Sequence, residues 1–362
     1  MDRIPAALLG ATGMTGQQFI RCLEGHPYFE LKVLTASEKN VGKRYDEAAK
    51  WYIEGDLPAS VAALKIVETS VEAVLNEAEV KVVFCGLPSD RAKPLEPEFA
   101  RHGLHVFSDA GCYRQDPDVP VVIGEVNGDH LALLPRQREQ RPWPGSLVKN
   151  PNCTVTGAAM VLKPLAQFGL KQVYLSSMQA VSGAGYDGVP SMAILDNVIP
   201  YIVDEEEKVE AEAVMLLGTL DPAAQEVRNH PMGFSASCHR VATLYGHIEA
   251  LFIEFEQEVD LQEVKAAIRE FRGLPQELQL PTAPRQPLIL FDDDQPFRPQ
   301  VRLDRHLGQP ERAAGMAVAV GRVRYDHGRN KIKLINLAHN TIRGASANAV
   351  LTAELALQQG WI

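Results

Sequence analysis

The stretch G-A-T-G-M-T-G, residues 10–16, follows directly after the apolar run Ala6–Leu9 and opens a helical pattern that extends to Leu23. Small residues let the backbone approach a pyrophosphate closely, and a helix start offers free N–H groups and a positive dipole end. The spacing is GxxGxxG instead of GxGxxG, so the strand–turn–helix context supports the interpretation more than the glycines do. With a second apolar run at Leu31–Leu34, the stretch predicts a dinucleotide-binding βαβ unit.

Short apolar runs continue to alternate with helical stretches through the first part of the chain. Val80–Cys85 is such a run, a helical stretch then extends to His102, and His105–Ser108 follows as a further strand. This alternation favours a parallel sheet that is covered by helices on both faces. We therefore expect an α/β fold in which residues 1–150 form a Rossmann-type domain with a doubly wound parallel sheet.

The pattern changes after about Asp129. Residues 134–148 are rich in Pro, Arg and Gln, and they predict a loop or linker. Longer strands of alternating polarity follow, which indicate an antiparallel or mixed sheet with one covered face. These strands are expected at Gln172–Ala180, Ser235–Glu256, Met316–Tyr325 and Lys331–Leu337. We expect a second, α+β domain over residues 151–340. A helix at Gly344–Gln359 belongs to a final segment, 341–362, that joins the first domain.

Composition and charge argue against several classes of protein. The 362 residues carry 36 Lys and Arg against 46 Asp and Glu, which gives a formal net charge of −10. An acidic chain is a poor candidate for nucleic-acid binding, because that binding depends on a basic face. No apolar run approaches the ~18 residues of a membrane helix. The five scattered cysteines form neither a CxxC motif nor a Cys/His metal spacing. We expect a cytoplasmic protein with no membrane segment, metal site or nucleic-acid partner.

The end of the second expected strand bears on the choice of cofactor. An NAD-selective site places Asp or Glu about 20 residues after the glycine-rich turn, where it binds the ribose hydroxyls. Here Ala36 and Ser37 stand at that place, and Lys39 and Lys43 follow. A hydroxyl and ammonium groups suit the 2′-phosphate of NADP(H), although Glu38 stands among them. NADP(H) is therefore the favoured cofactor, and solvated loop charges are the alternative interpretation of the lysines.

One cysteine stands at a predicted helix start. The sequence N-P-N-C-T occupies Asn150–Thr154, and apolar residues at helical spacing follow it. The helix dipole and free N–H groups stabilise a thiolate at such a place, so we expect a lowered pKa and a nucleophilic role for Cys153. A small buried cysteine is the alternative interpretation, and it fits Cys22, Cys85 and Cys238 in their apolar patterns.

A nucleophilic thiol needs a base, and ten histidines are available. His247 lies in the alternating stretch C-H-R-V-A-T-L-Y-G-H-I-E, seven residues after Arg240. In one regular strand these two side chains point to opposite faces, unless a bulge near Gly246 intervenes. The pattern alone does not choose the base, and positions on a sheet surface are the alternative for both residues.

The acidic run V-D-E-E-E-K, residues 203–208, has two interpretations. Asp204 predicts a helix cap ahead of an acidic first turn, which is a complete structural explanation of the run. Glu205 and Lys208 are three residues apart on one helix face, so together they also suit a zwitterionic substrate. From composition alone the solvated helix start is favoured.

Six collinear stretches extend over nearly the whole chain: GATGMTGQ, NPNCT, SGAGYDGVPSMAILDNVIPYI, EEEK, SCHRVATLYGH and HNTIRGASANAVLTAEL. They resemble the aspartate-semialdehyde dehydrogenase family, in particular its archaeal and fungal branch. The resemblance implies that the second domain is catalytic and assembles the chain into a homodimer or homotetramer. It also implies a reductive dephosphorylation, in which L-aspartyl 4-phosphate and NADPH give L-aspartate semialdehyde, NADP and phosphate. That reaction belongs to lysine, threonine and methionine biosynthesis.

The resemblance also implies roles for individual residues. Cys153 is implied to form a thioacyl-enzyme, His247 to act as acid and base, and Gln179 to orient the acyl group. The implied substrate contacts are Arg240 with the carboxylate, Glu205 with the ammonium, and Lys208 and Arg114 with the phosphate. The implied cofactor contacts are Gly10, Thr12, Gly13, Met14, Thr15, Ser37, Lys39 and, near the nicotinamide, Asn340.

Three positions depart from the family pattern. Asp109 stands where Asn is usual, Ala242 where Pro is common, and Gly86 where a slightly larger residue is usual. A carboxylate at Asp109 opposes phosphate binding by an amount that depends on its burial. Reduction of malonyl-CoA through the same cysteine is therefore an alternative function. A non-catalytic NADP-binding protein on this scaffold is a third interpretation, and the joint presence of the catalytic and substrate residues argues against it.

Overall fold

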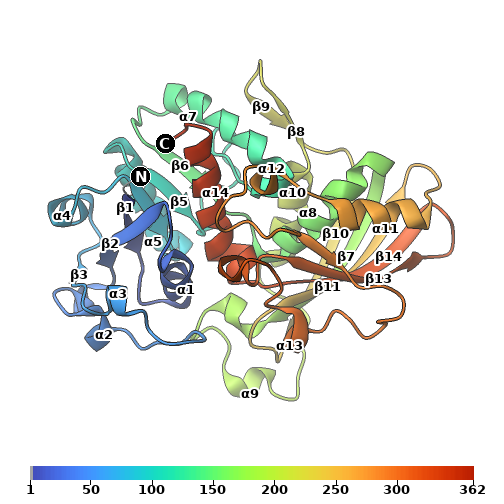
Figure 1. Ribbon diagram of the computed structural model, residues 1–362, viewed down its shortest axis with the longest axis horizontal. Coiled ribbons are helices and arrows are strands. Elements are labelled where there is room, and N and C mark those ends of the chain that lie inside the picture. The colour runs from blue at the N-terminus through green and yellow to red at the C-terminus, as the bar shows by residue number, and fades with distance from the viewer. Residues whose placement is uncertain (1–2) are drawn as a thin grey trace.

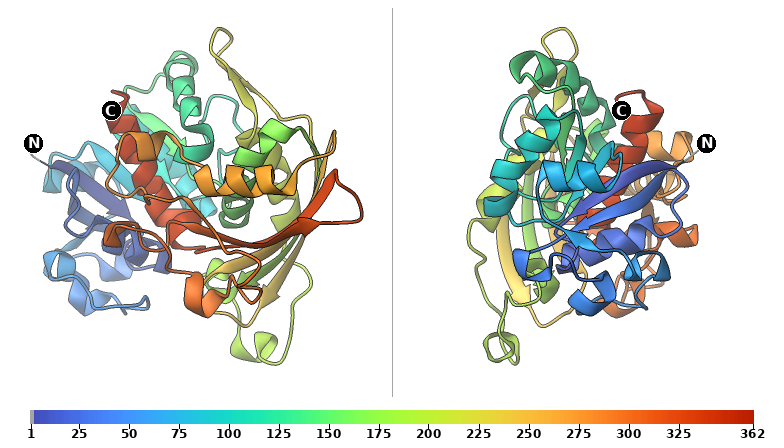
Figure 2. Two further views of the ribbon diagram at one scale, coloured as in Figure 1. Left: turned by 45° about the vertical axis from the view of Figure 1, so that its right-hand side comes forward. Right: turned by 90° about the vertical axis from the view of Figure 1, so that its left-hand side faces the viewer.

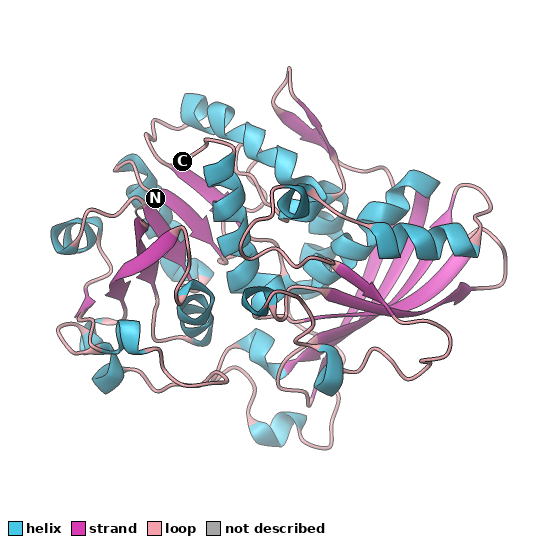
Figure 3. Cartoon of the chain, viewed as in Figure 1, coloured by secondary structure: helices cyan, strands magenta, loops and turns pink. Residues whose placement is uncertain are grey.

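The computed structural model describes residues 3–362 and contains two large sheets side by side (Figures 1 and 3). The first sheet has six strands in the order β3-β2-β1-β4-β5-β6, and every pairing in it is parallel. Its members are β1 (Ile4–Leu9), β2 (Phe29–Thr35), β3 (Ile66–Val67), β4 (Val82–Cys85), β5 (His105–Ser108) and β6 (Ser146–Lys149). This is the strand order of a Rossmann fold, so the predicted doubly wound parallel sheet is confirmed.

Helices cover both faces of this sheet, because its strands bury apolar side chains on both sides. One face packs against α1 (Met14–Leu23) and against α14 (Ala347–Gln358) near the C-terminus. The other face packs against α4 (Val71–Glu77) and α5 (Ser89–Arg101). In Figure 2 the red α14 accordingly lies beside the blue start of the chain. The last helix therefore belongs to the core of the first sheet.

The second sheet also has six strands, in the order β10-β7-β11-β14-β13-β12. The strands β7, β11, β14 and β13 pair antiparallel in succession, whereas β10 and β12 each join an edge in parallel. The members are β7 (Leu170–Ala180), β10 (Gly233–Val241), β11 (His247–Phe255), β12 (Leu288–Leu290), β13 (Val318–Tyr325) and β14 (Lys331–Ala338). The predicted mixed sheet is confirmed.

Only one face of the second sheet is covered within the described residues 3–362. Three helices pack on the covered face: α8 (Cys153–Leu165), α10 (Glu205–Leu216) and α11 (Leu261–Glu270). The opposite face carries Tyr174, Met178 and Phe252, whose side chains are 55%, 37% and 40% exposed. Large apolar side chains grouped on one open face are typical of a surface that meets another protein.

The outer edge of β10 is closed by side-chain and main-chain acceptors. The N–H groups of Ala236 and Cys238 donate to the carboxylates of Glu210 and Glu206 on α10, both at distances below 3.0 Å. The next N–H on this edge, that of Arg240, donates to the carbonyl of Ile199 at 2.9 Å. Three alternate amides of the edge strand therefore already have partners within the chain.

Two expectations from the sequence are wrong in detail. Residues 134–148 are no linker, because they form α7 (Leu134–Gln140) and the last strand of the first sheet, β6. Gln137 fixes α7 against the sheet, because its buried amide forms hydrogen bonds with both the N–H and the carbonyl of Leu147 on β6. The expected single strand Ser235–Glu256 is two strands, β10 and β11, separated by a turn that contains Gly246 at a φ of +92°.

The remaining elements are short. They include α2 (Tyr45–Ala48), α3 (Ala59–Ala62), α6 (Gly124–Asn127), α9 (Ser191–Ile194), α12 (Leu274–Glu277), α13 (Val301–Asp304), the hairpin β8 (Thr219–Asp221) and β9 (Glu226–Arg228), and the π-helical turn η6 (Ile342–Ser346). None of the helices within residues 3–362 combines the length and the apolar surface needed to span a lipid bilayer. The same part of the chain contains no group of three His, Cys, Asp or Glu side chains placed to hold a metal ion.

Candidate active site

Cys153 is the first residue of α8, and its neighbours fix the start of that helix. The side chain of Asn152 caps the helix by accepting hydrogen bonds from the N–H groups of Thr154 and Val155, at 2.8 and 3.2 Å. Gly344 in the turn η6 packs directly on the cysteine, because a Cβ at that position would lie 2.7 Å from Cβ of Cys153. The thiol is therefore held between the helix start and the turn that leads into α14.

His247, the first residue of β11, faces the cysteine. Its Nε2 lies 3.3 Å from Sγ of Cys153, and its Nδ1 accepts a hydrogen bond from the N–H of Ala180 at 3.0 Å. Burial, reinforced by the positive charge of Arg240, lowers the pKa of His247 to about 3. The imidazole is therefore neutral over the whole physiological pH range.

Arg240 and His247 approach the same place from two different strands. β7 lies between β10 and β11, and its last residue, Ala180, bonds both side chains. The carbonyl of Ala180 accepts from Nη1 of Arg240 at 2.9 Å, and its N–H donates to His247. The turn between the strands removes the expected conflict between opposite faces, since the seven-residue spacing is not measured along one strand.

The expected lowering of the Cys153 pKa is wrong. Burial is the largest cause and raises the pKa of this thiol, the carboxylate of Glu205 raises it further, and the charges of Arg240 and Arg114 oppose this only in part. The N–H groups that a free helix start would offer are occupied by the cap at Asn152. At neutral pH the pair is therefore a neutral thiol beside a neutral imidazole.

Two more predicted residues lie along β7 and β10. Gln179 is 1% exposed, pairs with Arg240 across the two strands, and donates to the hydroxyl of Ser177 at 3.2 Å. Arg240 is 6% exposed. Gly183, just after β7, packs on Arg240 and His247, because a Cβ there would lie 2.8 Å from Nη1 of Arg240 and 3.6 Å from Nε2 of His247. The close approach of this backbone explains a glycine at position 183.

The start of α10 brings Glu205 to the cysteine helix, where its Oε1 accepts a hydrogen bond from the hydroxyl of Thr154 at 3.2 Å. Lys208 is half exposed, and its ammonium lies 3.9 Å from the carboxylate of Asp204. The expected cap by Asp204 is absent, because this residue has a φ of +57° and its side chain accepts no hydrogen bond from the described helix start. Asp204 instead pairs with Lys208 from outside the helix.

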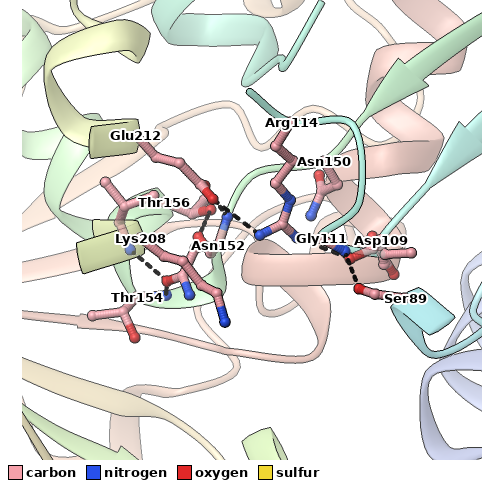
Figure 4. Close-up of polar contacts among 12 residues, drawn as sticks. Ser89, Asp109, Gly111, Arg114, Asn150, Asn152, Thr154, Thr156, Lys208 and Glu212 are labelled. Atoms are coloured by element: carbon pink, nitrogen blue, oxygen red, sulfur yellow. Dashed lines mark hydrogen bonds and ion pairs between the residues drawn. The ribbon is translucent and has the colours of Figure 1, made fainter. Parts of the chain in front are cut away.

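Arg114 belongs to a buried polar network (Figure 4). It forms an ion pair of 3.1 Å with Glu212 on α10, and Glu212 in turn accepts from the N–H of Asn152 at 2.5 Å. Another Arg114 nitrogen donates to the main-chain carbonyl of Asp109 at 2.9 Å. The sequence analysis missed Glu212, although it lies seven residues, or two helical turns, after Glu205 and so shares its face.

Asp109 has buried carboxylate oxygens, and neither has a hydrogen-bond partner within residues 3–362. Burial raises the pKa of Asp109 to about 7, against the charges of Arg114 and Lys149. A neutral carboxyl group offers one donor and one acceptor, as an amide does. At neutral pH Asp109 therefore carries only part of a negative charge, and it differs less from Asn than the sequence indicates.

A cavity of about 790 Å³ extends from the glycine-rich turn to Gly183, the residue that packs beside Arg240 and His247. It is lined by Thr12, Gly13, Met14, Thr15, Ser37 and Lys39 at one end and by Asp109, Ser182, Gly183 and Thr341 at the other. Gly10 lines an adjoining cavity with Ser37 and Lys39. The predicted cofactor residues are thus brought together, except that Asn340 and Lys43 do not line either cavity.

The shape of the turn fits a dinucleotide. Gly10 has a φ of +81°, and a Cβ on Gly16 would lie 2.2 Å from the Gly10 carbonyl, so both positions require glycine. Helix α1 starts at Met14, the preceding Gly13 provides no side-chain cap, and the first turn holds no acid. Its free N–H groups therefore face the cavity as a pyrophosphate site would require.

Asn340 has internal partners at both ends of its amide. Its Oδ1 accepts from the N–H of Gly246 at 2.8 Å, and its Nδ2 donates to the hydroxyl of Ser182 at 2.9 Å. It thereby holds the turn before His247 against a residue of the cavity wall. Its role near the nicotinamide stays a prediction.

Comparison with known proteins covers both parts of the chain. Residues 5–134 match the family model "Semialdehyde dehydrogenase, NAD binding domain", and residues 162–343 match "Semialdehyde dehydrogenase, dimerisation domain". An aspartate-semialdehyde dehydrogenase of Methanothermobacter thermautotrophicus is 47% identical over 97% of this chain and 98% of its own. A malonyl-CoA reductase (NADP) of Metallosphaera sedula is 38% identical over 99% and 98%. The crystal structure of aspartate-semialdehyde dehydrogenase with NADP from Candida albicans superposes with a TM-score of 0.88 at 36% identity, over 99% of this chain and all of that one. Since the likeness extends over the whole length and includes both domains, the chain belongs to the aspartate-semialdehyde dehydrogenase family.

Proposed function

We propose that this chain catalyses the NADPH-dependent reductive dephosphorylation of L-aspartyl 4-phosphate to L-aspartate semialdehyde, a reaction of amino-acid biosynthesis. Cys153 is the nucleophile: its sulfur displaces phosphate from the acyl group and forms a thioester. NADPH, when bound, supplies the hydride that reduces this thioester to the aldehyde. Division of the reaction into two steps replaces one difficult displacement by two easier ones.

His247 is the acid in this proposal. Its Nδ1 accepts from the N–H of Ala180, so the proton of the neutral imidazole is on Nε2, 3.3 Å from the sulfur of Cys153. From there it donates a hydrogen bond to the sulfur, and to the acyl oxygen when that oxygen gains charge. The thiol gives its own proton to the departing phosphate as the C–S bond forms and the C–O bond breaks. Gln179 orients the acyl group from the end of β7.

The observation that carries the choice of substrate is the set of charges around Cys153. Glu205, Arg240 and Arg114 all act on this thiol electrostatically. Glu205 and Arg240 complement the ammonium and the carboxylate of an amino-acid acyl phosphate, and Arg114, which also pairs with Glu212, supplies positive charge for its phosphate. In this assignment Glu205 receives the ammonium and Arg240 the carboxylate. Arg114 receives the phosphate with help from Lys208, whose half-exposed ammonium is held only by an exposed ion pair of 3.9 Å with Asp204.

Reduction of malonyl-CoA is the second candidate, favoured by the likeness to the reductase from Metallosphaera sedula. It uses the same cysteine and leaves Glu205 without an ammonium to bind. Without an ammonium to bind, the carboxylate of Glu205 opposes an anionic substrate and also raises the pKa of Cys153.

The test is an assay of both reactions with one preparation. NADP reduction by L-aspartate semialdehyde is expected, and it should depend on phosphate or arsenate. Malonyl-CoA with NADPH should give little or no turnover. Efficient reduction of malonyl-CoA, together with no phosphate-dependent oxidation of the semialdehyde, would replace the first proposal by the second.

The assembly and the division of the chain form part of the proposal. Residues 1–150 with 341–362 form the NADP-binding domain, which the packing of α14 on the first sheet supports. Residues 151–340 form the catalytic domain, and two copies meet through its open face, around Tyr174, Met178 and Phe252, as a homodimer or within a homotetramer. The five free cysteines suit the reducing cytoplasm.

A further inference from the structure

A loop outside the glycine-rich turn supplies a second wall of the cofactor cavity. Lys50 and Tyr52 line the cavity together with Ser37 and Lys39. Lys43, which lies between these two groups in the sequence, lines neither this cavity nor the adjoining one. Lys50 is therefore a second ammonium group of this cavity beside Lys39, and Arg91 lines the adjoining cavity with Ser37 and Lys39.

The loop is fastened to the glycine-rich turn by one buried side chain. Gln17 on α1 is 0% exposed, and its Nε2 donates to the carbonyls of Lys50 at 2.6 Å and of Thr12 at 3.2 Å. Its Oε1 accepts from the N–H of Tyr52 at 2.7 Å. The amide of Gln17 thus joins the main chain at Lys50 and Tyr52 to the main chain of the glycine-rich turn at Thr12. The position of Lys50 is consequently set by the same helix that starts at the cofactor.

Charge at this end of the cavity favours a doubly charged anion. Within residues 3–362, neither Lys39 nor Lys50 takes part in an ion pair. Glu38 lines the adjoining cavity beside Lys39 and offsets part of its charge. A phosphate monoester carries about −1.5 to −2 charges at neutral pH, so one offset ammonium is a poor match for it. Further positive charge restores the balance, and it comes from Lys50 in this cavity and from Arg91 in the adjoining one.

We infer that Lys50 binds the 2′-phosphate of NADP(H) together with Ser37 and Lys39, and that Gln17 is the residue that positions it. The inference rests on NADP(H) as the cofactor and is independent of the acyl substrate. Binding measured without turnover therefore separates it from the proposed reaction.

The experiment is a titration of the whole protein with NADPH and with NADH, followed by the fluorescence of the reduced cofactor. Lys50→Ala should raise the Kd for NADPH about tenfold and change the Kd for NADH by less than about twofold, since NADH lacks the 2′-phosphate. Lys43→Ala is the matched control, an exposed lysine outside the cavity, and should leave both constants within about twofold. Equal losses for the two cofactors in Lys50→Ala, or an equal effect of Lys43→Ala, would overturn the inference.

The positioning role has its own readout. Gln17→Leu should weaken NADPH more than NADH, and Lys50→Ala should cost less in that background than it costs alone, because the two residues act as one unit. Gln17→Glu keeps the acceptor for Tyr52 and replaces Gln17→Leu if thermal denaturation shows that the leucine variant does not fold. Additive effects of the Gln17 and Lys50 substitutions would show that Gln17 supports the fold alone and would overturn its assignment as a positioning residue.

Discussion

The N–H of Ala180 and Nδ1 of His247 form a hydrogen bond of 3.0 Å that decides which protons the histidine holds. An imidazolium would carry a proton on Nδ1 and would direct it against this amide. Burial and the charge of Arg240 act in the same direction, and together they lower the pKa of His247 to about 3. The histidine is therefore a fixed Nε2–H donor toward Cys153, and the resting pair contains no thiolate–imidazolium ions.

The first prediction concerns the reactivity of that pair. Alkylation of Cys153 by iodoacetamide should accelerate steadily from about pH 6 to about pH 10, because both the raised pKa of the thiol and the lowered pKa of His247 lie outside this interval. The rate is followed by mass spectrometry of the peptide that contains Cys153. A plateau of fast alkylation that begins near pH 6.5 and disappears in His247→Gln would show an ion pair instead.

Removal of the nucleophile should separate catalysis from binding. Cys153→Ser is expected to lose turnover, because a serine hydroxyl stays protonated near neutral pH and the acyl-enzyme does not form. NADPH affinity and thermal stability should be those of the unmodified protein, since Cys153 does not line the cofactor cavity. Near-normal activity in Cys153→Ala would refute the covalent mechanism.

Glu205 tests the amino-acid substrate. Glu205→Gln should lower kcat/KM for L-aspartate semialdehyde by ~10- to 100-fold, because one charge-assisted hydrogen bond contributes about 1.5–3 kcal/mol. Glu207→Gln, an exposed carboxylate on the same helix, is the control and should have little effect. If Glu205 only supports the start of α10, its substitution will lower the Tm and leave kcat/KM of the folded protein unchanged.

Glu249 should make stability depend on pH. This residue is fully buried on β11, its Oε2 accepts from the amide of Asn336 at 2.6 Å, and burial raises its pKa to about 8. Between its ordinary value of 4.5 and about 8, the folded state binds a proton that the unfolded state has released. The free energy of unfolding should therefore fall as the pH rises through this interval, by at most about 1.4 kcal/mol per pH unit from this group. Denaturant melts of Glu249→Gln at several pH values should show a free energy of unfolding that changes less with pH. An unchanged pH dependence would contradict the assignment.

The open face of the second sheet gives a prediction about assembly. Phe252→Glu places a charge among Tyr174 and Met178, and it should convert the oligomer into monomers, because an unpaired charge is costly to bury in an interface. Sedimentation velocity measures the outcome. Lys171→Glu, an exposed position nearer the end of β7, serves as the control. An unchanged sedimentation coefficient for Phe252→Glu would show that copies meet elsewhere.

The parts of the fold that depend on local pattern were predictable from the sequence. The apolar runs and the glycine-rich turn indicate the parallel sheet, because the period of the side chains and the conformation of glycine are local properties. The helix at Leu134–Gln140 was missed because its stability comes from Gln137, a polar residue buried against β6. Composition treats such a residue as a loop former.

The sequence singled out Cys153, His247 and Arg240, which lie together in the structure, but it did not indicate how they interact. The spacing of Arg240 and His247 suggested opposite faces, since nothing in the sequence shows that β7 lies between their strands. The pKa of Cys153 was expected in the wrong direction, because burial and the position of Glu205 arise only in the tertiary structure. Glu212 was missed for the same reason: a buried glutamate that bonds Arg114 looks like one more charge on a solvated helix.

The acceptors along the outer edge of β10 limit how copies of this chain can meet. A free strand edge recruits the edge of another molecule, and this growth has no natural end, so it leads toward fibres and precipitates. Here Glu206, Glu210 and the carbonyl of Ile199 already occupy the amides that such growth would use. Contact is left to the broad apolar face, where a two-fold pairing uses up the surface and stops. A few acceptors at one margin of the sheet thus favour a closed assembly of fixed size over an open polymer.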